Sequence, residues 1–123
     1  MTPWFRALFV VGLVAAAAVA AVQLPETVTL DKAKNKQAPV VMSHKLHAEK
    51  IACDTCHHTQ KGLTAQTATE VPTCASCHLD PAKPEVPSMR EMSLTKNPLH
   101  KLCIDCHKKE AKGPTKCAEC HKK

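Results

Sequence analysis

Apolar residues are concentrated at the beginning of this chain of 123 residues. An uncharged apolar run extends from Ala7 to Val22, after the positive charge of Arg6, and it includes the small residues Ala18-Val19-Ala20. The run is shorter than the roughly 20 residues that a membrane-spanning helix needs. We therefore predict that residues 1–22 are a cleaved secretory signal peptide. A retained N-terminal membrane anchor is the alternative, and both place residues 23–123 outside the cytoplasm.

Beyond residue 22 the chain predicts only short elements. Residues 27–30 and 40–42 are expected to form a two-stranded antiparallel hairpin, with residues 32–37 as its turn region. Short helices are expected over about 43–50, 88–95 and 99–109. Eight prolines lie beyond residue 22, and the Pro-rich segment 79–87 is expected to be a surface loop. The whole of 23–123 is predicted to be one domain.

The composition indicates that side chains alone do not make the core of this domain. Trp4, Phe5 and Phe9 are the only aromatic residues in the chain, and all three precede residue 22. A domain of about 100 residues normally relies on aromatic rings for buried area. A large planar cofactor would supply that area, and the chain without its cofactor is expected to be largely unfolded.

A pentapeptide, Cys-x-x-Cys-His, occurs four times and uses all eight cysteines. The cysteines are Cys53 and Cys56, Cys74 and Cys77, Cys103 and Cys106, and Cys117 and Cys120, followed by His57, His78, His107 and His121. This spacing is the attachment signature of c-type haem: two thiols form thioethers with the porphyrin, and the histidine binds the iron axially. Four-thiolate zinc sites and disulfides are the alternatives, but they leave the recurring histidine unexplained. Thioredoxin-like chemistry needs a βαβ pattern, which is absent.

Four haems with two axial ligands each would need eight ligands, and the motif histidines supply four. The chain has four further histidines, the number still needed: His44, His47, His58 and His100. We therefore predict bis-histidine ligation of every haem, with Met42, Met89 or Met92 as the competing ligand at one site. His44 and His47 are three residues apart on the expected first helix and share a face. His58 directly follows His57, so these two should serve different haems. Such short elements require the haems to lie close together.

These motifs resemble the class III multihaem cytochromes c, the group of tetrahaem cytochrome c3 and trihaem cytochrome c7. The opening His44-x-x-His47, then Cys53-x-x-Cys56-His57-His58, is similar to the family's first motif, and residues 113–123 are similar to the c7 tail. The resemblance covers residues from about 27 to 123. It implies a small, mostly irregular multihaem fold, with a few short α-helices and an N-terminal β-hairpin packed around four haems c. It also implies the axial pairs: His57 with His44, His78 with His58, His107 with His47, and His121 with His100.

Positive charge is concentrated near the C-terminus. Residues 101–123 hold seven lysines, Lys101, Lys108, Lys109, Lys112, Lys116, Lys122 and Lys123, against Asp105, Glu110 and Glu119. This face is predicted to dock an acidic redox partner. A solvated surface that offsets the haem propionates is the alternative. Nucleic acid is not expected as a partner, and a membrane is expected only if residues 1–22 are retained.

Together these features predict a periplasmic, low-potential electron-transfer protein rather than an enzyme. The resemblance implies hydrogenases or formate dehydrogenases as donors and membrane redox complexes as acceptors. The alternatives are a membrane-anchored tetrahaem subunit of a respiratory complex and an outer-sphere metal reductase.

Overall fold

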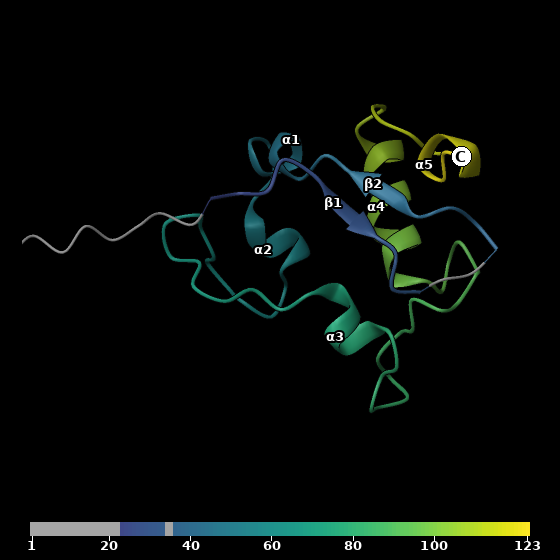
Figure 1. The fold of residues 1–123 in the computed structure, drawn as a ribbon, viewed down its shortest axis with the longest axis horizontal. Helices are drawn as coiled ribbons and strands as arrows, with labels where there is room; N and C mark the ends of the chain where they lie inside the picture. Colours follow the sequence, from purple (N-terminus) through teal and green to yellow (C-terminus); the bar gives the residue numbers. More distant parts are fainter. Residues whose placement is uncertain (1–22, 34–35) are drawn as a thin grey trace, which may run out of the picture.

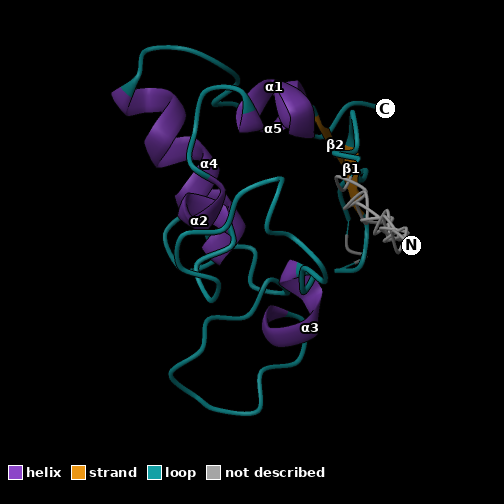
Figure 2. Ribbon diagram, turned by 90° about the vertical axis from the view of Figure 1, so that its left-hand side faces the viewer, coloured by secondary structure: helices purple, strands orange, loops and turns teal. Residues whose placement is uncertain are grey.

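The computed structural model describes residues 23–33 and 36–123, and its elements are short (Figure 1). They are two strands, β1 (Val28–Leu30) and β2 (Val40–Met42), and five helices: α1 (His44–Ala48), α2 (Cys53–Cys56), α3 (Cys74–His78), α4 (Pro98–Lys109) and α5 (Cys117–Cys120). Figure 2 shows that loops make up most of the ribbon between them. The mostly irregular architecture expected from the sequence is therefore confirmed. The predicted signal peptide, residues 1–22, and positions 34–35 of the predicted turn lie outside the described residues.

The hairpin is present where the sequence predicted it. β1 and β2 are antiparallel, with Val28 opposite Met42 and Leu30 opposite Val40. Since α1 begins two residues after β2, the hairpin fixes where the first helix and its histidines start.

Two of the three predicted helices are also confirmed, as α1 and α4. The longer one, α4, begins after Asn97, whose side-chain oxygen accepts from the N–H groups of Leu99 and His100, and Pro98 takes the first helical position. This is the arrangement that a helix start favours, because Pro lacks an N–H and its φ already suits a helix. Just beyond the helix, Ala111 has a positive φ of 49°, a conformation typical of helix C-terminal ends.

The third predicted helix, over 88–95, is wrong: this segment is a series of turns. Side chains in the segment bond to its own backbone. The hydroxyl of Ser88 accepts from the N–H of Arg90, and that of Ser93 accepts from the N–H of Thr95. Such local bonds compete with the helical pattern. The sequence reasoning also missed α2, α3 and α5, each of which begins at the first cysteine of a motif.

Few side chains are buried in this fold. Among the described residues only Ala68, Met89 and Asn97 are buried, with exposed fractions of 8%, 7% and 5%, and no side chain is fully buried. Leu46, Met92 and Leu94 are more than half exposed. Aliphatic packing therefore contributes little to holding the described elements together, as the composition predicted. No helix in the described part of the chain is long and apolar enough to cross a membrane.

Candidate haem site

Four pairs of imidazole rings lie at nearly the same separation. The ring centroids are 6.2 Å apart for His44 and His57, 6.1 Å for His47 and His107, 5.9 Å for His58 and His78, and 6.3 Å for His100 and His121. An iron held between two imidazoles, about 2 Å from each ligating nitrogen, places the ring centroids about 6 Å apart. The residues therefore fit a bis-histidine haem iron at four places. Their role as iron ligands stays a prediction.

The pairs join each motif histidine to one of the four remaining histidines, in the combinations that the resemblance implied. On α1, His44 faces the ring of His57 and His47 faces that of His107, although the two are only three residues apart. The neighbours His57 and His58 also turn to different partners. Because one short helix and one dipeptide contribute to three of the four pairs, these three pairs must lie close together.

Hydrogen bonds orient several of these rings. Nδ1 of His107 lies 2.6 Å from the carbonyl oxygen of Pro114, and Nδ1 of His121 lies 2.6 Å from the carbonyl oxygen of Ala38. Nδ1 of His78 lies 2.8 Å from the carbonyl oxygen of Pro87. A carbonyl oxygen can only accept, so Nδ1 must carry the proton and donate it. That tautomer leaves the Nε2 lone pair of each ring free to bind a metal.

The distal ring of His47 is held in the same way, but that of His44 is not. Nδ1 of His47 donates to the carbonyl of Ser43 at 2.7 Å. Nδ1 of His44 is buried without a hydrogen-bond partner. Burial, and then the neighbouring His44, lower the pKa of His57. A neutral imidazole is the form that ligates a metal, so this pair also suits an iron.

None of the eight cysteines is joined to another in a disulfide. The described residues contain no cluster of three or more Cys, His, Asp or Glu side chains that could hold a metal ion. Burial raises the pKa of the Cys103 thiol to about 11 and also raises the pKa of Cys56. The described cysteines are therefore not arranged as four-thiolate zinc sites.

The histidine geometry also bears on the methionine alternative. Each motif histidine already faces a second imidazole, so Met42, Met89 and Met92 are not needed as ligands. The side chain of Met92 is 55% exposed and that of Met89 is 7% exposed. The structure favours histidine over methionine at all four positions.

Sequence reasoning missed the residues that orient the ligands. The carbonyl groups of Pro87 and Pro114 carry no side-chain signal, and Asn97 and Gly113 lie outside the four Cys-x-x-Cys-His motifs. Gly113 has a φ of +93°, and a Cβ on it would lie 2.8 Å from Cδ2 of His107. The Gly113-Pro114 dipeptide is a turn signal. It could have indicated a tight turn beside His107, but not the hydrogen bond that the turn supplies.

Comparison with known proteins identifies the family of this chain. The profile described as "Class III cytochrome C family" matches residues 20–121. The chain belongs to the class III cytochrome c family, whose members are multihaem electron-transfer proteins with covalently bound haem c.

Particular relatives come from several bacteria. The chain is 38% identical to a cytochrome c3 of Desulfovibrio desulfuricans over 91 residues, covering 74% of this chain and 85% of that one. It is 33% identical to a cytochrome c7 of Geobacter metallireducens over 91 residues, covering 73% and 71%. The di-tetraheme cytochrome c3 of Desulfovibrio gigas has a similar structure, with a TM-score of 0.53, 22% identity and coverage of 81% of this chain and 98% of that one. That structural likeness supports the fold alone.

Proposed function

We propose that this protein is a low-potential periplasmic electron carrier with four covalent haems c, each bound by two histidines. The single observation that carries the proposal is the set of four imidazole pairs, with centroids 5.9 to 6.3 Å apart. We number the haems by their motifs. Haem 1 is bound by Cys53 to His57, haem 2 by Cys74 to His78, haem 3 by Cys103 to His107 and haem 4 by Cys117 to His121.

The cysteines and the histidines of each site have different roles. When bound, each haem iron supplies a one-electron change between the ferric and ferrous states. The paired cysteines would hold the porphyrin covalently, and the two imidazoles of each pair would both bind its iron, which would leave no coordination position for a substrate. Full bis-histidine ligation therefore supports electron transfer over inner-sphere catalysis, and it favours a low potential relative to Met/His ligation.

The proposed partner is an acidic redox protein. The seven lysines of residues 101–123 are all exposed. They lie on α4, on the segment between α4 and α5, and after α5, around the motifs of haems 3 and 4. Opposite charge on a hydrogenase, a formate dehydrogenase or a membrane cytochrome complex would steer the encounter and make its rate fall with ionic strength.

Intact mass of the native exported protein tests the haem number and the N-terminus together. We expect residues 23–123 or a close N-terminal variant plus four haems, and a Cys74→Ala/Cys77→Ala variant with one haem fewer. A native mass with three haems or fewer, or carbon monoxide binding to the reduced native protein, would contradict the proposal. Retention of residues 1–22 would instead support a membrane-anchored form.

A further inference from the structure

One buried polar side chain links the loop before α4 to the start of that helix. Asn97 is 5% exposed and is the one buried polar or charged residue among those that the structure describes. Its Oδ1 accepts from the N–H groups of Leu99 at 2.9 Å and His100 at 3.2 Å. Its Nδ2 donates to the carbonyls of Met89 at 2.9 Å and Glu91 at 2.7 Å. The amide's two protons and both lone pairs of its oxygen are thus used.

The segment that Asn97 holds is bonded in turn to the end of α3. The N–H of Met89 donates to the carbonyl of His78 at 2.7 Å, and Nδ1 of His78 donates to the carbonyl of Pro87 at 2.8 Å. Next to this contact, the Arg90 guanidinium donates to both carboxylate oxygens of Asp80, at 2.9 and 3.3 Å. The turn around Met89 is therefore attached to a proposed ligand of haem 2.

These contacts form an unbroken path of hydrogen bonds. It leads from the carbonyl of His78 to the N–H of Met89, and from the carbonyl of Met89 through the side chain of Asn97 to the N–H of His100. Under the function proposed above, His78 is a ligand of haem 2 and His100 is a ligand of haem 4. We propose that Asn97 is a positioning residue that sets the ligand geometry of haem 2 and haem 4 together. This inference depends on the proposed ligation of those two haems.

The physical reason is that the amide has two separable functions. Its oxygen caps α4 next to His100, and its nitrogen holds the loop that contacts His78. The orientation of an axial imidazole and the hydrogen bond at its other nitrogen tune the potential of the iron. Buried hydrogen-bond networks with all groups paired are rigid, whereas a buried group that loses its partner is costly. A change at the nitrogen alone should therefore disturb His78 first and leave the cap intact.

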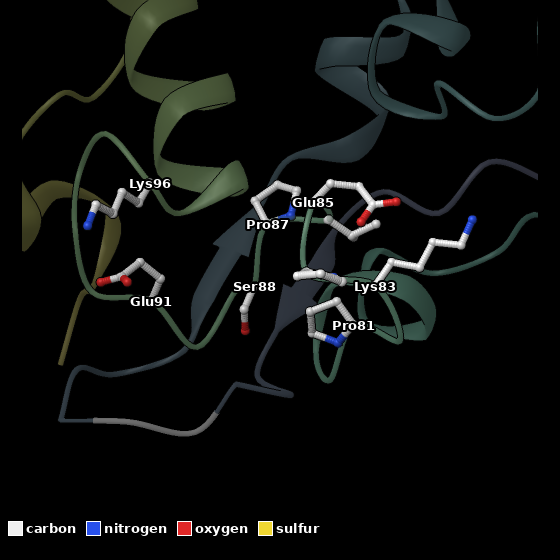
Figure 3. A pocket seen from close by; sticks show the side chains of 9 residues that line it. Pro81, Lys83, Glu85, Pro87, Ser88, Glu91 and Lys96 are labelled. Atoms are coloured by element: carbon white, nitrogen blue, oxygen red, sulfur yellow. The ribbon is translucent and has the colours of Figure 1, made fainter.

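Asn97→Asp separates the two functions. The carboxylate keeps the acceptor for Leu99 and His100, but it places an oxygen against the carbonyls of Met89 and Glu91. Lys96→Gln is the matched control, because it changes the net charge by the same amount. Lys96 is exposed, and Figure 3 shows it beside Glu91 at the edge of a surface pocket of this loop. Asn97→Ala, which removes both functions, is the second variant.

The measurements are the potentials of the individual haems, followed by NMR during a redox titration, and amide hydrogen exchange. For Asn97→Asp we expect the potential of haem 2 to shift, and the N–H of Met89 to exchange about tenfold faster, because the carbonyls of Met89 and Glu91 lose their donor. For Asn97→Ala we expect haems 2 and 4 to shift together, with haems 1 and 3 unchanged relative to Lys96→Gln. Shifts that are equal at all four haems, or confined to haem 4 in both variants, would overturn the inference.

The same samples distinguish a failure of this inference from a failure of the proposed function. The wild-type protein must first show four haems by mass and low-spin bis-histidine spectra. If it does not, the proposed function is wrong and the path has no iron ligand at its ends. If it does, and the variants move no potential specifically, Asn97 only stabilises the loop and the inference is wrong.

Discussion

The two histidines of α1 serve pairs that are built differently. His47 and its partner His107 both donate from Nδ1 to backbone carbonyls, at 2.7 and 2.6 Å. In the other pair, Nδ1 of His44 is buried without a partner, and burial lowers the pKa of its partner His57. One helix thus supplies a fully hydrogen-bonded pair, the site of haem 3, and a partly unsatisfied pair, the site of haem 1.

The difference shows how the backbone can give chemically identical haem sites different reduction potentials. An imidazole that donates a hydrogen bond from Nδ1 is a more basic ligand at Nε2. A more basic ligand stabilises the ferric state and lowers the potential. All four haems would have the same ligands. The hydrogen-bond partners of the imidazole Nδ1 atoms are therefore one of the few features that can distinguish the four sites.

Of the variants considered, Gly113→Ala should disturb the pair of His47 and His107 most severely. The glycine has a φ of +93°, and an added Cβ would lie 2.8 Å from Cδ2 of His107 and 2.9 Å from its Nε2. Strain and overlap together should lower the free energy of unfolding by about 3 kcal/mol. The expected result is a less stable protein in which haem 3 loses its regular ligation, measured by denaturant unfolding and by the low-spin signals.

Gly62→Ala is the matched control for that prediction. Gly62 also has a positive φ, +69°, but its added Cβ would meet nothing within 4 Å. Only the backbone term remains, about 1 kcal/mol. Equal costs for the two variants would show that contact with the His107 ring plays no part.

The potentials of the wild-type protein test the comparison without a mutation. Haem 3 should have a lower potential than haem 1, because both of its imidazoles donate from Nδ1. A net hydrogen bond contributes about 0.5–1.5 kcal/mol, which corresponds to about 20–65 mV for one electron. NMR-monitored redox titration resolves the two haems. A haem 1 potential at or below that of haem 3 would refute the ranking.

Acid should weaken the haem 3 site by way of Glu119. Its Oε2 accepts from the N–H groups of Thr115 at 3.0 Å and Lys116 at 3.1 Å, next to the Pro114 carbonyl that binds His107. Those two N–H donors lower the pKa of Glu119 from its usual 4.5. The contribution of this group is therefore complete above pH 4.5 and is lost as the pH falls through the lower folded pKa.

Unfolding of Glu119→Gln measured against pH checks this expectation. The variant should be somewhat less stable than the wild-type protein at neutral pH, by less than Gly113→Ala, because the residue is exposed. It should also lack the loss of stability that the wild-type carboxylate causes below pH 4.5. If the two proteins lose stability in parallel on acidification, Glu119 is not the group responsible.

The sequence could predict what the motifs and the local pattern encode. The ring pairs followed from a repeat and a family resemblance, and the hairpin at Val40–Met42 and helix α4 followed from local signals. The helix expected over 88–95 failed because Ser88, Ser93 and Asn97 bond to nearby backbone groups. The carbonyls of Pro87 and Pro114 could not be predicted at all, because any residue has a carbonyl and only the folded chain decides where it points.

A surface charge on α1 should leave the difference in potential between haem 1 and haem 3 unchanged. Lys45 lies between the two histidines of α1, and its Nζ is 2.9 Å from Oε1 of Glu26, with both side chains at least half exposed. Exposed pairs of this kind contribute little to stability. Glu26→Gln should therefore leave the unfolding transition unchanged. It should raise the potentials of haems 1 and 3 equally, by less than about 10 mV at physiological salt.

The value of this smallest effect is that it separates two explanations of the ranking. A charge on the outer surface of α1 acts through solvent on both haems, and salt screens it. The hydrogen bonds of His47 and His107 act through their own rings and do not depend on salt. If Glu26→Gln, or a rise in ionic strength, removed the gap between haem 1 and haem 3, surface charge would set the ranking. An unchanged gap leaves the Nδ1 donors of His47 and His107, and the missing partner of His44, as its source.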